Sequence, residues 1–115
     1  MKIIIAGSRN FVDYTKLKTV CDFTLKNQKD IEIVSGTASG ADKLGERYAK
    51  ENGYPVKKFP ADWKKNGKAA GPIRNKQMAE YADGLIVFWD GKSKGTESMI
   101  NLGYQHGLKV RISLI

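Results

Sequence analysis

Three short segments of the sequence combine glycine with serine, threonine or basic side chains, and each follows an apolar run. These segments are Gly7–Asn10 after Ile3–Ala6, Gly36–Ala41 after Ile31–Ser35, and Asp90–Thr96 after Leu85–Trp89. Backbone amides exposed in a glycine-bearing turn before a helix bind phosphate or carboxylate groups. One such turn is weak evidence, because a tight turn between a strand and a helix also needs glycine. Three turns, two of them with basic side chains, favour an anion or nucleotide site.

The segment from Ile31 to Asp42 is the one around which the rest of the chain is organised. Its apolar run ends at Ser35, breaks at Gly36 and is followed by a new helix near Gly40. We expect Ser39 to cap this helix, with Asp42 in the carboxylate position of a capping box. Asp42 then has either a structural role or a role in the site, and its position favours the structural one.

Arg74 is the strongest candidate for a direct phosphate contact. It lies in the first turn of a predicted helix and shares a face with Met78 and Tyr81. If Met78 packs on the sheet, the guanidinium points towards the strand ends, where it could hold a phosphate with two parallel hydrogen bonds. A structural salt bridge is the alternative. Arg9 follows the same logic from a loop.

Three further side chains could take part in chemistry or in binding. Glu97, in the first turn of a helix, could act as a general base or bind ribose hydroxyls, or it could simply favour the helix dipole. Trp63 and Trp89 could stack on a base. Core packing is the favoured role for Trp89, because it ends an apolar strand.

Composition limits the classes of protein to which the chain can belong. At 115 residues, with 41% hydrophobic and 28% charged residues, we expect one folded domain spanning 1–115. A single cysteine excludes an internal disulfide, which fits a protein of the reducing cytoplasm. One cysteine and one histidine also argue against a zinc site, and we expect no metal and no cofactor. No apolar run reaches membrane-spanning length. Cys21 falls on the apolar face of a predicted helix and is expected in the core.

Positive charge is concentrated near the proposed site. The formal net charge is +8, and the segment 57–76 contains six lysines and one arginine against a single acidic residue, Asp62. Lys92 and Lys94 lie in the third glycine-bearing segment. This distribution indicates a polyanionic partner.

Strand and helix patterns alternate along the chain. The predicted strands are Lys2–Ala6, Ile31–Ser35, Val56–Phe59, Leu85–Trp89 and Val110–Leu114. The predicted helices begin after Asp13 and then span Gly40–Asn52, Pro72–Ala82 and Thr96–His106, with a long basic loop over Ala61–Gly71. This alternation predicts an α/β fold with a doubly wound, Rossmann-like parallel sheet.

The character of each strand predicts the strand order. The first and fourth strands are the most uniformly apolar and should be central, whereas the third and fifth have edge patterns. The order that satisfies both conditions is 3-2-1-4-5. Its switch point lies between the first and fourth strands, where ligands bind at the carboxyl ends of such sheets.

Five segments together resemble a known family. They are Gly7-Ser8-Arg9, Ser35–Asp42, Phe59–Trp63, Ala70–Asn75 and Gly95–Met99. In this order they resemble the YspA/YpsA-related branch of the SLOG superfamily, which includes the Lonely Guy phosphoribohydrolases and the DNA-processing protein DprA. The resemblance covers nearly the whole chain and is most specific at Ala70–Asn75. It implies a Rossmann-like fold, a nucleotide-derived ligand and a homo-oligomer.

The glycine-bearing segments, Arg74 and the resemblance together predict which residues hold the ligand. They are Gly7, Ser8, Arg9, Gly36, Thr37, Ser39, Gly40, Asp42, Arg74, Asn75, Gly91, Gly95, Thr96 and Glu97. The chain departs from the Lonely Guy pattern Pro-Gly-Gly-x-Gly-Thr-x-x-Glu, because Met99 stands where those enzymes have their catalytic glutamate. Glu97 is the nearest carboxylate and is displaced by two positions.

The predicted function is therefore binding of a nucleotide-derived ligand, of the ADP-ribose, NAD or cyclic nucleotide type, by a sensor or sequestering protein. Two alternatives remain. One is an N-glycosidase acting on nucleoside 5′-monophosphates, with Arg74 orienting the substrate and Glu97 as the acid–base group. The other is a DNA-binding protein, which the net charge and DprA suggest.

Overall fold

The computed structural model describes all residues from 1 to 115, and its centre is one parallel β-sheet. The strands are β1 (Lys2–Gly7), β2 (Glu32–Ser35), β3 (Val56–Lys58), β4 (Gly84–Trp89) and β5 (Lys109–Leu114). They are hydrogen-bonded in the order β3-β2-β1-β4-β5, and every neighbouring pair is parallel. The predicted fold class and strand order are confirmed.

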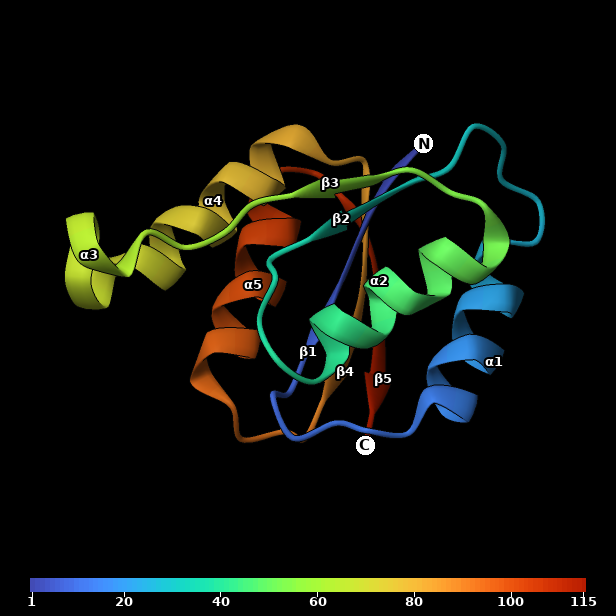
Figure 1. The fold of residues 1–115 in the computed structure, drawn as a ribbon, viewed down its shortest axis with the longest axis horizontal. Coiled ribbons are helices and arrows are strands. Elements are labelled where there is room, and N and C mark those ends of the chain that lie inside the picture. Colours follow the sequence, from blue (N-terminus) through green and yellow to red (C-terminus); the bar gives the residue numbers. More distant parts are fainter.

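Helices cover both faces of the sheet (Figure 1). On one face lie α1 (Tyr14–Leu25) and α2 (Ala41–Asn52), and on the other lie α4 (Ala70–Tyr81) and α5 (Lys94–Gln105). Each face has its own apolar core, because successive residues of a strand point to opposite sides of the sheet. No helix is long and apolar enough to cross a lipid bilayer.

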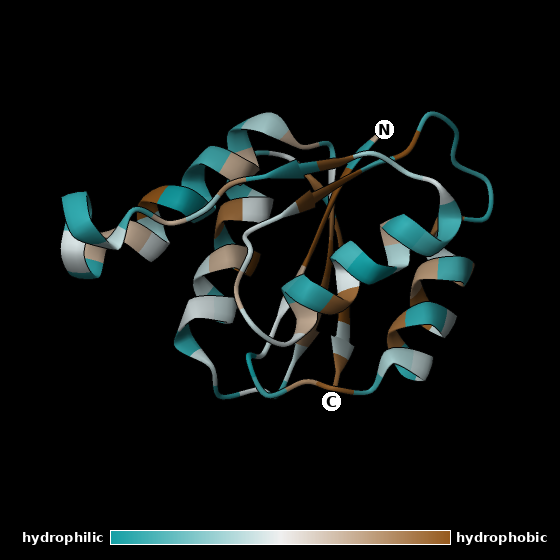
Figure 2. Cartoon of the chain, in the orientation of Figure 1, coloured by the Kyte–Doolittle hydropathy of each residue, from teal (hydrophilic) through white to brown (hydrophobic).

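The burial of the strands explains their order. In β1, Ile4 and Ile5 are completely buried, one in each core, and β4 is buried from Gly84 to Phe88. Figure 2 shows the hydrophobic colour concentrated on these central strands. In contrast, β3 has two exposed lysines and β5 is exposed at four of its six positions, as expected of edge strands.

Helix α1 follows its sequence pattern closely. The Asp13 side chain caps it by accepting a hydrogen bond of 3.0 Å from the backbone N–H of Lys16. Leu17, Cys21 and Leu25 form its buried face. Burial raises the pKa of the Cys21 thiol to about 12, so this cysteine is a core residue and not a nucleophile at neutral pH.

The segment predicted as a long basic loop is mostly helical, which corrects the prediction for Ala61–Gly71. It forms α3 (Trp63–Asn66) and the 3₁₀-helix η1 (Gly67–Ala69), and α4 begins at Ala70, two residues before Pro72. The physical reason is a cap, because the Asp62 side chain accepts a hydrogen bond from the backbone N–H of Lys65. We call α3 and η1 together the basic arm; α3 lies at one end of the molecule, beyond α4 (Figure 1).

Candidate functional site

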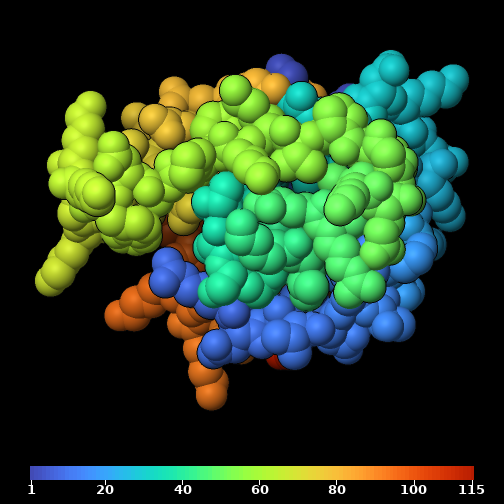
Figure 3. Space-filling model, in the orientation of Figure 1, coloured from blue at the N-terminus to red at the C-terminus, as the bar shows by residue number.

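Two adjoining hollows lie at the carboxyl ends of the central strands. The first has a volume of about 400 Å³ and is lined from the end of β1, the start of α2, α4 and the start of α5. The second has a volume of about 370 Å³ and lies against the turn between β2 and α2. Both are lined by Arg9, Ala38, Trp63 and Arg74. Figure 3 shows the surface hollowed where the yellow-green basic arm, the blue-green turn before α2 and the blue loop after β1 meet.

Arg74 is a buried cation without an acidic partner. Only 8% of its surface is exposed, and its Nε donates a hydrogen bond of 2.9 Å to Oδ1 of Asn75. Its Nη1 donates to the backbone carbonyl of Gly36. Both acceptors are neutral, and none of the four ion pairs within 4.0 Å in the protein involves Arg74. The alternative role of Arg74 in a structural salt bridge is therefore not seen within 4.0 Å, and the guanidinium lines both hollows.

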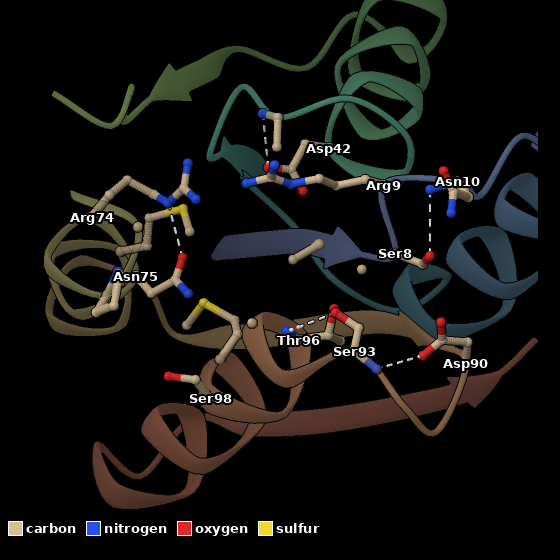
Figure 4. Close-up of a pocket in the computed structure, with 18 of the residues that line it drawn as sticks. Ser8, Arg9, Asn10, Asp42, Arg74, Asn75, Asp90, Ser93, Thr96 and Ser98 are labelled. Carbon is tan, nitrogen blue, oxygen red and sulfur yellow. Dashed lines mark hydrogen bonds between the residues drawn. The ribbon is translucent and has the colours of Figure 1, made fainter. Parts of the chain in front are cut away.

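Arg9 brings a second positive charge to the same place. It lies on the loop between β1 and α1, is exposed, and lines both hollows. Figure 4 shows its side chain extended from the β1 loop in the direction of Arg74. Burial lowers the pKa of Arg74 from its usual value, the nearby carboxylate of Asp42 opposes this shift, and the charge of Arg9 adds to it. An arginine nevertheless remains protonated at neutral pH. The two cations make this part of the cavity strongly attractive to an anion.

Asp42 is the buried carboxylate of the site. It is 5% exposed, and its Oδ2 accepts a hydrogen bond of 3.1 Å from the backbone N–H of Ala38. Burial raises the pKa of Asp42 to about 6, and the nearby charge of Glu46 raises it as well. The Ala38 N–H, Arg74 and Arg9 oppose this shift of the pKa. The carboxyl group therefore gains and loses its proton near pH 6.

The turn before α5 forms the opposite wall of the first hollow (Figure 4). Oδ1 of Asp90 accepts hydrogen bonds of 2.8 Å from the backbone N–H groups of Lys92 and Ser93, which lower the pKa of Asp90. The Ser93 hydroxyl caps α5 by accepting from the backbone N–H of Thr96. The positive end of a 12-residue helix is thereby held at the cavity.

Most of the residues proposed from the sequence lie around these two hollows. The first is lined by Gly7, Ser8, Arg9, Asp42, Trp63, Arg74, Asn75, Gly95 and Thr96. The second adds Gly36, Thr37 and Ser39. Other lining residues fall within segments identified from the sequence but were not proposed individually as ligand-binding residues: Asn10, Asp90, Ser93 and Ser98. A capping signal, Asp90 followed by Ser93 before a helix, could have identified two of these.

Four of the proposed residues lie outside the hollows. Glu97 is exposed on α5 and lines neither hollow. Trp89 packs against the core on the α4 and α5 side, and its Nε1 donates a hydrogen bond of 3.1 Å to the Ser93 carbonyl. Gly91 lies in the turn after β4 with a positive φ of 78°. Gly40 is in contact with the backbone after β1.

Gly40 also explains why the expected cap by Ser39 is wrong. The helix cap is Gly40 itself, with φ of 76° and no side-chain cap bond. The first helical N–H, of Ala41, donates instead to the carbonyl of Ser8 at 3.2 Å. A Cβ on Gly40 would lie 2.3 Å from that carbonyl oxygen, so only glycine allows this approach. The Asp42 side chain instead accepts a hydrogen bond from the backbone N–H of Ala38.

No group of three or more His, Cys, Asp or Glu side chains comes together in the structure. The site instead offers two guanidinium groups, hydroxyl groups and helix-end amides. These are donors suited to oxygen anions.

Comparison with known proteins places the chain in a family. The model of the YspA, cpYpsA-related SLOG family matches residues 1–66. The Gene 61 protein of Mycobacterium phage D29 is 31% identical over 116 residues, which cover 95% of this chain and 93% of the phage protein. The chain belongs to the YspA/cpYpsA-related SLOG family.

Two solved structures share the fold of this SLOG family member. DNA processing protein A (DprA) from Streptococcus pneumoniae has a TM-score of 0.78 at 22% sequence identity, and the match covers 96% of this chain and 49% of DprA. DprA from Helicobacter pylori, described for its single-stranded DNA binding mode, has a TM-score of 0.68 at 20% sequence identity. This match covers 97% of this chain and 64% of the DprA chain. The chain thus spans less than two thirds of either DprA chain.

Proposed function

We propose that this SLOG family member binds a nucleotide-derived small molecule through its phosphate groups and acts as a sensor or sequestering protein. The observation that carries the proposal is the buried guanidinium of Arg74 without a carboxylate partner. A buried charge that is not neutralised costs free energy, on the order of several kcal/mol. An anion bound at Arg74 would remove that cost and would gain charge-assisted hydrogen bonds.

The size and lining of the hollows support a nucleotide rather than inorganic phosphate alone. Their volumes of about 400 and 370 Å³ are in the range of small-molecule sites. Trp63 lines both hollows and is 52% exposed, so its ring could stack on a base. ADP-ribose, NAD and cyclic nucleotides each combine phosphate with a stacking base and fit this description.

Each wall of the first hollow would have a separate task. Arg74 and Arg9 would hold phosphate oxygens, and Asn75 would orient Arg74 through its Nε–H. The N-terminal end of α5 would supply amide donors. The backbone N–H groups of Ser8 and Asn10 already donate to the Phe88 carbonyl and the Ser8 hydroxyl. No step of this proposal needs a metal ion.

Native mass spectrometry of the freshly purified protein tests this function. We expect a bound species that, after denaturation, is identified as a phosphate-containing nucleotide derivative. Arg74→Ala should lose it, whereas Arg111→Ala should keep it, because Arg111 is an exposed arginine on β5 that lines neither hollow of the site. Protein that carries no ligand and binds none of the three candidate classes would contradict the proposal.

A second candidate function is binding of single-stranded DNA. Lys64, Lys65 and Lys68 lie on the basic arm next to Trp63, and the fold matches DprA, one of whose structures is described by that activity. Salt dependence distinguishes the two functions, because a polymer releases many counterions on binding. A steep loss of oligonucleotide affinity with salt, together with no nucleotide binding, would favour DNA.

The third candidate, an N-glycosidase, has less structural support. Its proposed acid–base group, Glu97, is exposed and lies outside both hollows.

A further inference from the structure

The site contains a second buried ionisable side chain, Asp42, close to the arginine proposed to hold the anion. A Cβ built on Gly36 would lie 2.8 Å from Oδ2 of Asp42 and 2.9 Å from Nη1 of Arg74. The two groups therefore approach the same point, although they do not form an ion pair within 4.0 Å. An anion bound at Arg74 would lie within a few ångströms of Asp42.

Charged groups from several elements face Asp42. Arg74 on α4 and Arg9 on the β1 loop are the cations, and Glu46, four residues further along α2, is the nearest acid. Asp90 lines the opposite wall of the same hollow.

Glu46 is already held by other partners. Its Oε2 accepts a hydrogen bond of 2.6 Å from the Ser35 hydroxyl, and its Oε1 lies within 4.0 Å of Lys43 and Lys58. Asp42 has only the Ala38 N–H as a hydrogen-bond partner. It is therefore the acid of the site that is most free to take up a proton.

We propose that the ligand's anionic group binds together with one proton, which Asp42 takes up. The inference rests on the proposed function, namely that an anion binds at Arg74. A second negative charge beside a buried carboxylate disfavours the ionised form, so bound ligand and protonated Asp42 stabilise each other. The protonated carboxyl group also gains an O–H donor that can point at the ligand's oxygen.

The direction of the pH effect follows from this coupling. Burial already raises the pKa of Asp42 to about 6 in the free protein, and a bound anion raises it further. Below pH 6 the proton is already present and affinity should not change with pH. Above pH 6 the proton must be taken from solution, so affinity should fall as pH rises. The fall should level off once the pH exceeds the pKa that Asp42 has in the complex.

Isothermal titration calorimetry at pH 6 and pH 8 tests this inference. The probes are ADP-ribose and inorganic sulfate, because neither phosphodiester-type groups nor sulfate change protonation between these pH values. We expect the dissociation constant of wild type to be at least about tenfold weaker at pH 8. Runs in buffers of different ionisation enthalpy should show up to one proton taken up per ligand at pH 8.

Two variants isolate the role of Asp42. Asp42→Asn keeps an oxygen acceptor for Ala38 but cannot ionise, so it should bind equally well at both pH values and take up no proton. Glu80→Gln removes one negative charge from an exposed position of α4 outside both hollows and should keep the wild-type pH dependence. Retained pH dependence in Asp42→Asn would overturn the assignment to Asp42.

The failure of this inference can be distinguished from failure of the proposed function. Binding by wild type with the same affinity at both pH values and no proton uptake overturns the inference alone. If neither probe binds, the same measurement uses NAD and a cyclic nucleotide. No binding of any of these ligands at either pH overturns the proposed function, and the inference with it. The wild-type measurement decides between these outcomes even if Asp42→Asn does not fold.

Discussion

The guanidinium of Arg74 on α4 donates a hydrogen bond to the backbone carbonyl of Gly36, directly after β2. This contact joins the helix that follows the basic arm to the turn that precedes α2. Because the partner is a neutral carbonyl, it positions the cation without neutralising it. The remaining N–H donors of Arg74 are left for the hollows that it lines.

Gly36→Ala should disturb this arrangement. The new Cβ would lie 2.8 Å from Asp42 Oδ2 and 2.9 Å from Arg74 Nη1, which is closer than atoms pack. Both atoms are the ends of side chains that can shift, so we expect a loss of only about 1 kcal/mol in the free energy of unfolding, the low end of overpacking costs. Ligand binding should weaken more clearly, because the Arg74 guanidinium must move. Urea denaturation measures the first effect.

Gly95→Ala is the matched control for stability. It lies in the first turn of α5, and a Cβ there would meet no atom within 4 Å. Alanine is the better helix former, so this variant should gain roughly 0.5–1 kcal/mol. If both glycine variants had the same stability, close packing at Gly36 would not be limiting.

The raised pKa of Asp42 predicts how stability depends on pH. Its ordinary value is 3.8 and burial raises the pKa in the folded protein to about 6, so the folded state binds this proton more tightly than the unfolded state. The stabilisation is present at low pH and is lost as pH rises from about 4 to about 6. Two pKa units correspond to about 3 kcal/mol.

Asp42→Asn cannot lose that stabilisation, because its side chain does not titrate. As the pH is raised from 4 to 7, the free energy of unfolding of this variant should therefore increase by up to about 3 kcal/mol relative to that of wild type. Urea denaturation at both pH values measures the change. Other carboxylates titrate equally in both proteins and cancel in the difference. If the difference in the free energy of unfolding between the two proteins were the same at pH 4 and pH 7, the pKa of Asp42 would not be shifted in the folded state.

The basic arm should become protected when ligand binds. Trp63 lines both hollows, and its ring lies 3.6 Å from the point that a Cβ on Gly71 of α4 would occupy. A ligand that stacks on this ring would therefore fix α3 against α4. Trypsin cleavage after the arm lysines should slow by several-fold in saturating ligand. In Trp63→Ala the protection should be smaller. A cleavage rate unaffected by ligand in wild type would mean that the arm takes no part in binding.

Glu97→Gln decides between a binding protein and a glycosidase. Because Glu97 is exposed outside both hollows, we expect wild type to release no free base from a panel of nucleoside 5′-monophosphates. The variant should then bind ligand like wild type. Base release by wild type that Glu97→Gln abolishes would establish the glycosidase and refute the binding-only function.

The sheet could be predicted from the sequence because its signals are local. The unbroken isoleucines of β1 and the apolar run of β4 mark central strands, and the lysines of β3 mark an edge. Strand order then places the loops after β1 and β4 side by side, which is why the position of the candidate site could be anticipated.

Details that depend on contacts between distant residues could not be predicted. The Ser39 cap is replaced by the approach of Gly40 to Ser8, which no local pattern encodes. The helix α3 has four residues, too few to show an apolar period. Glu97 points away because adjacent helical positions differ by about 100°, and neighbouring Thr96 takes the buried position.

The affinity of Arg74 variants for ADP-ribose, NAD and a cyclic nucleotide tests the central claim most directly. Calorimetry should show that Arg74→Ala costs about 2–3 kcal/mol of binding free energy for whichever ligand binds, the usual worth of hydrogen bonds to a charged group. Arg74→Lys should recover only part, because an ammonium lacks the planar fork. Arg111→Ala removes an exposed arginine that lines neither hollow and should bind like wild type. Unchanged affinity in Arg74→Ala would contradict the account.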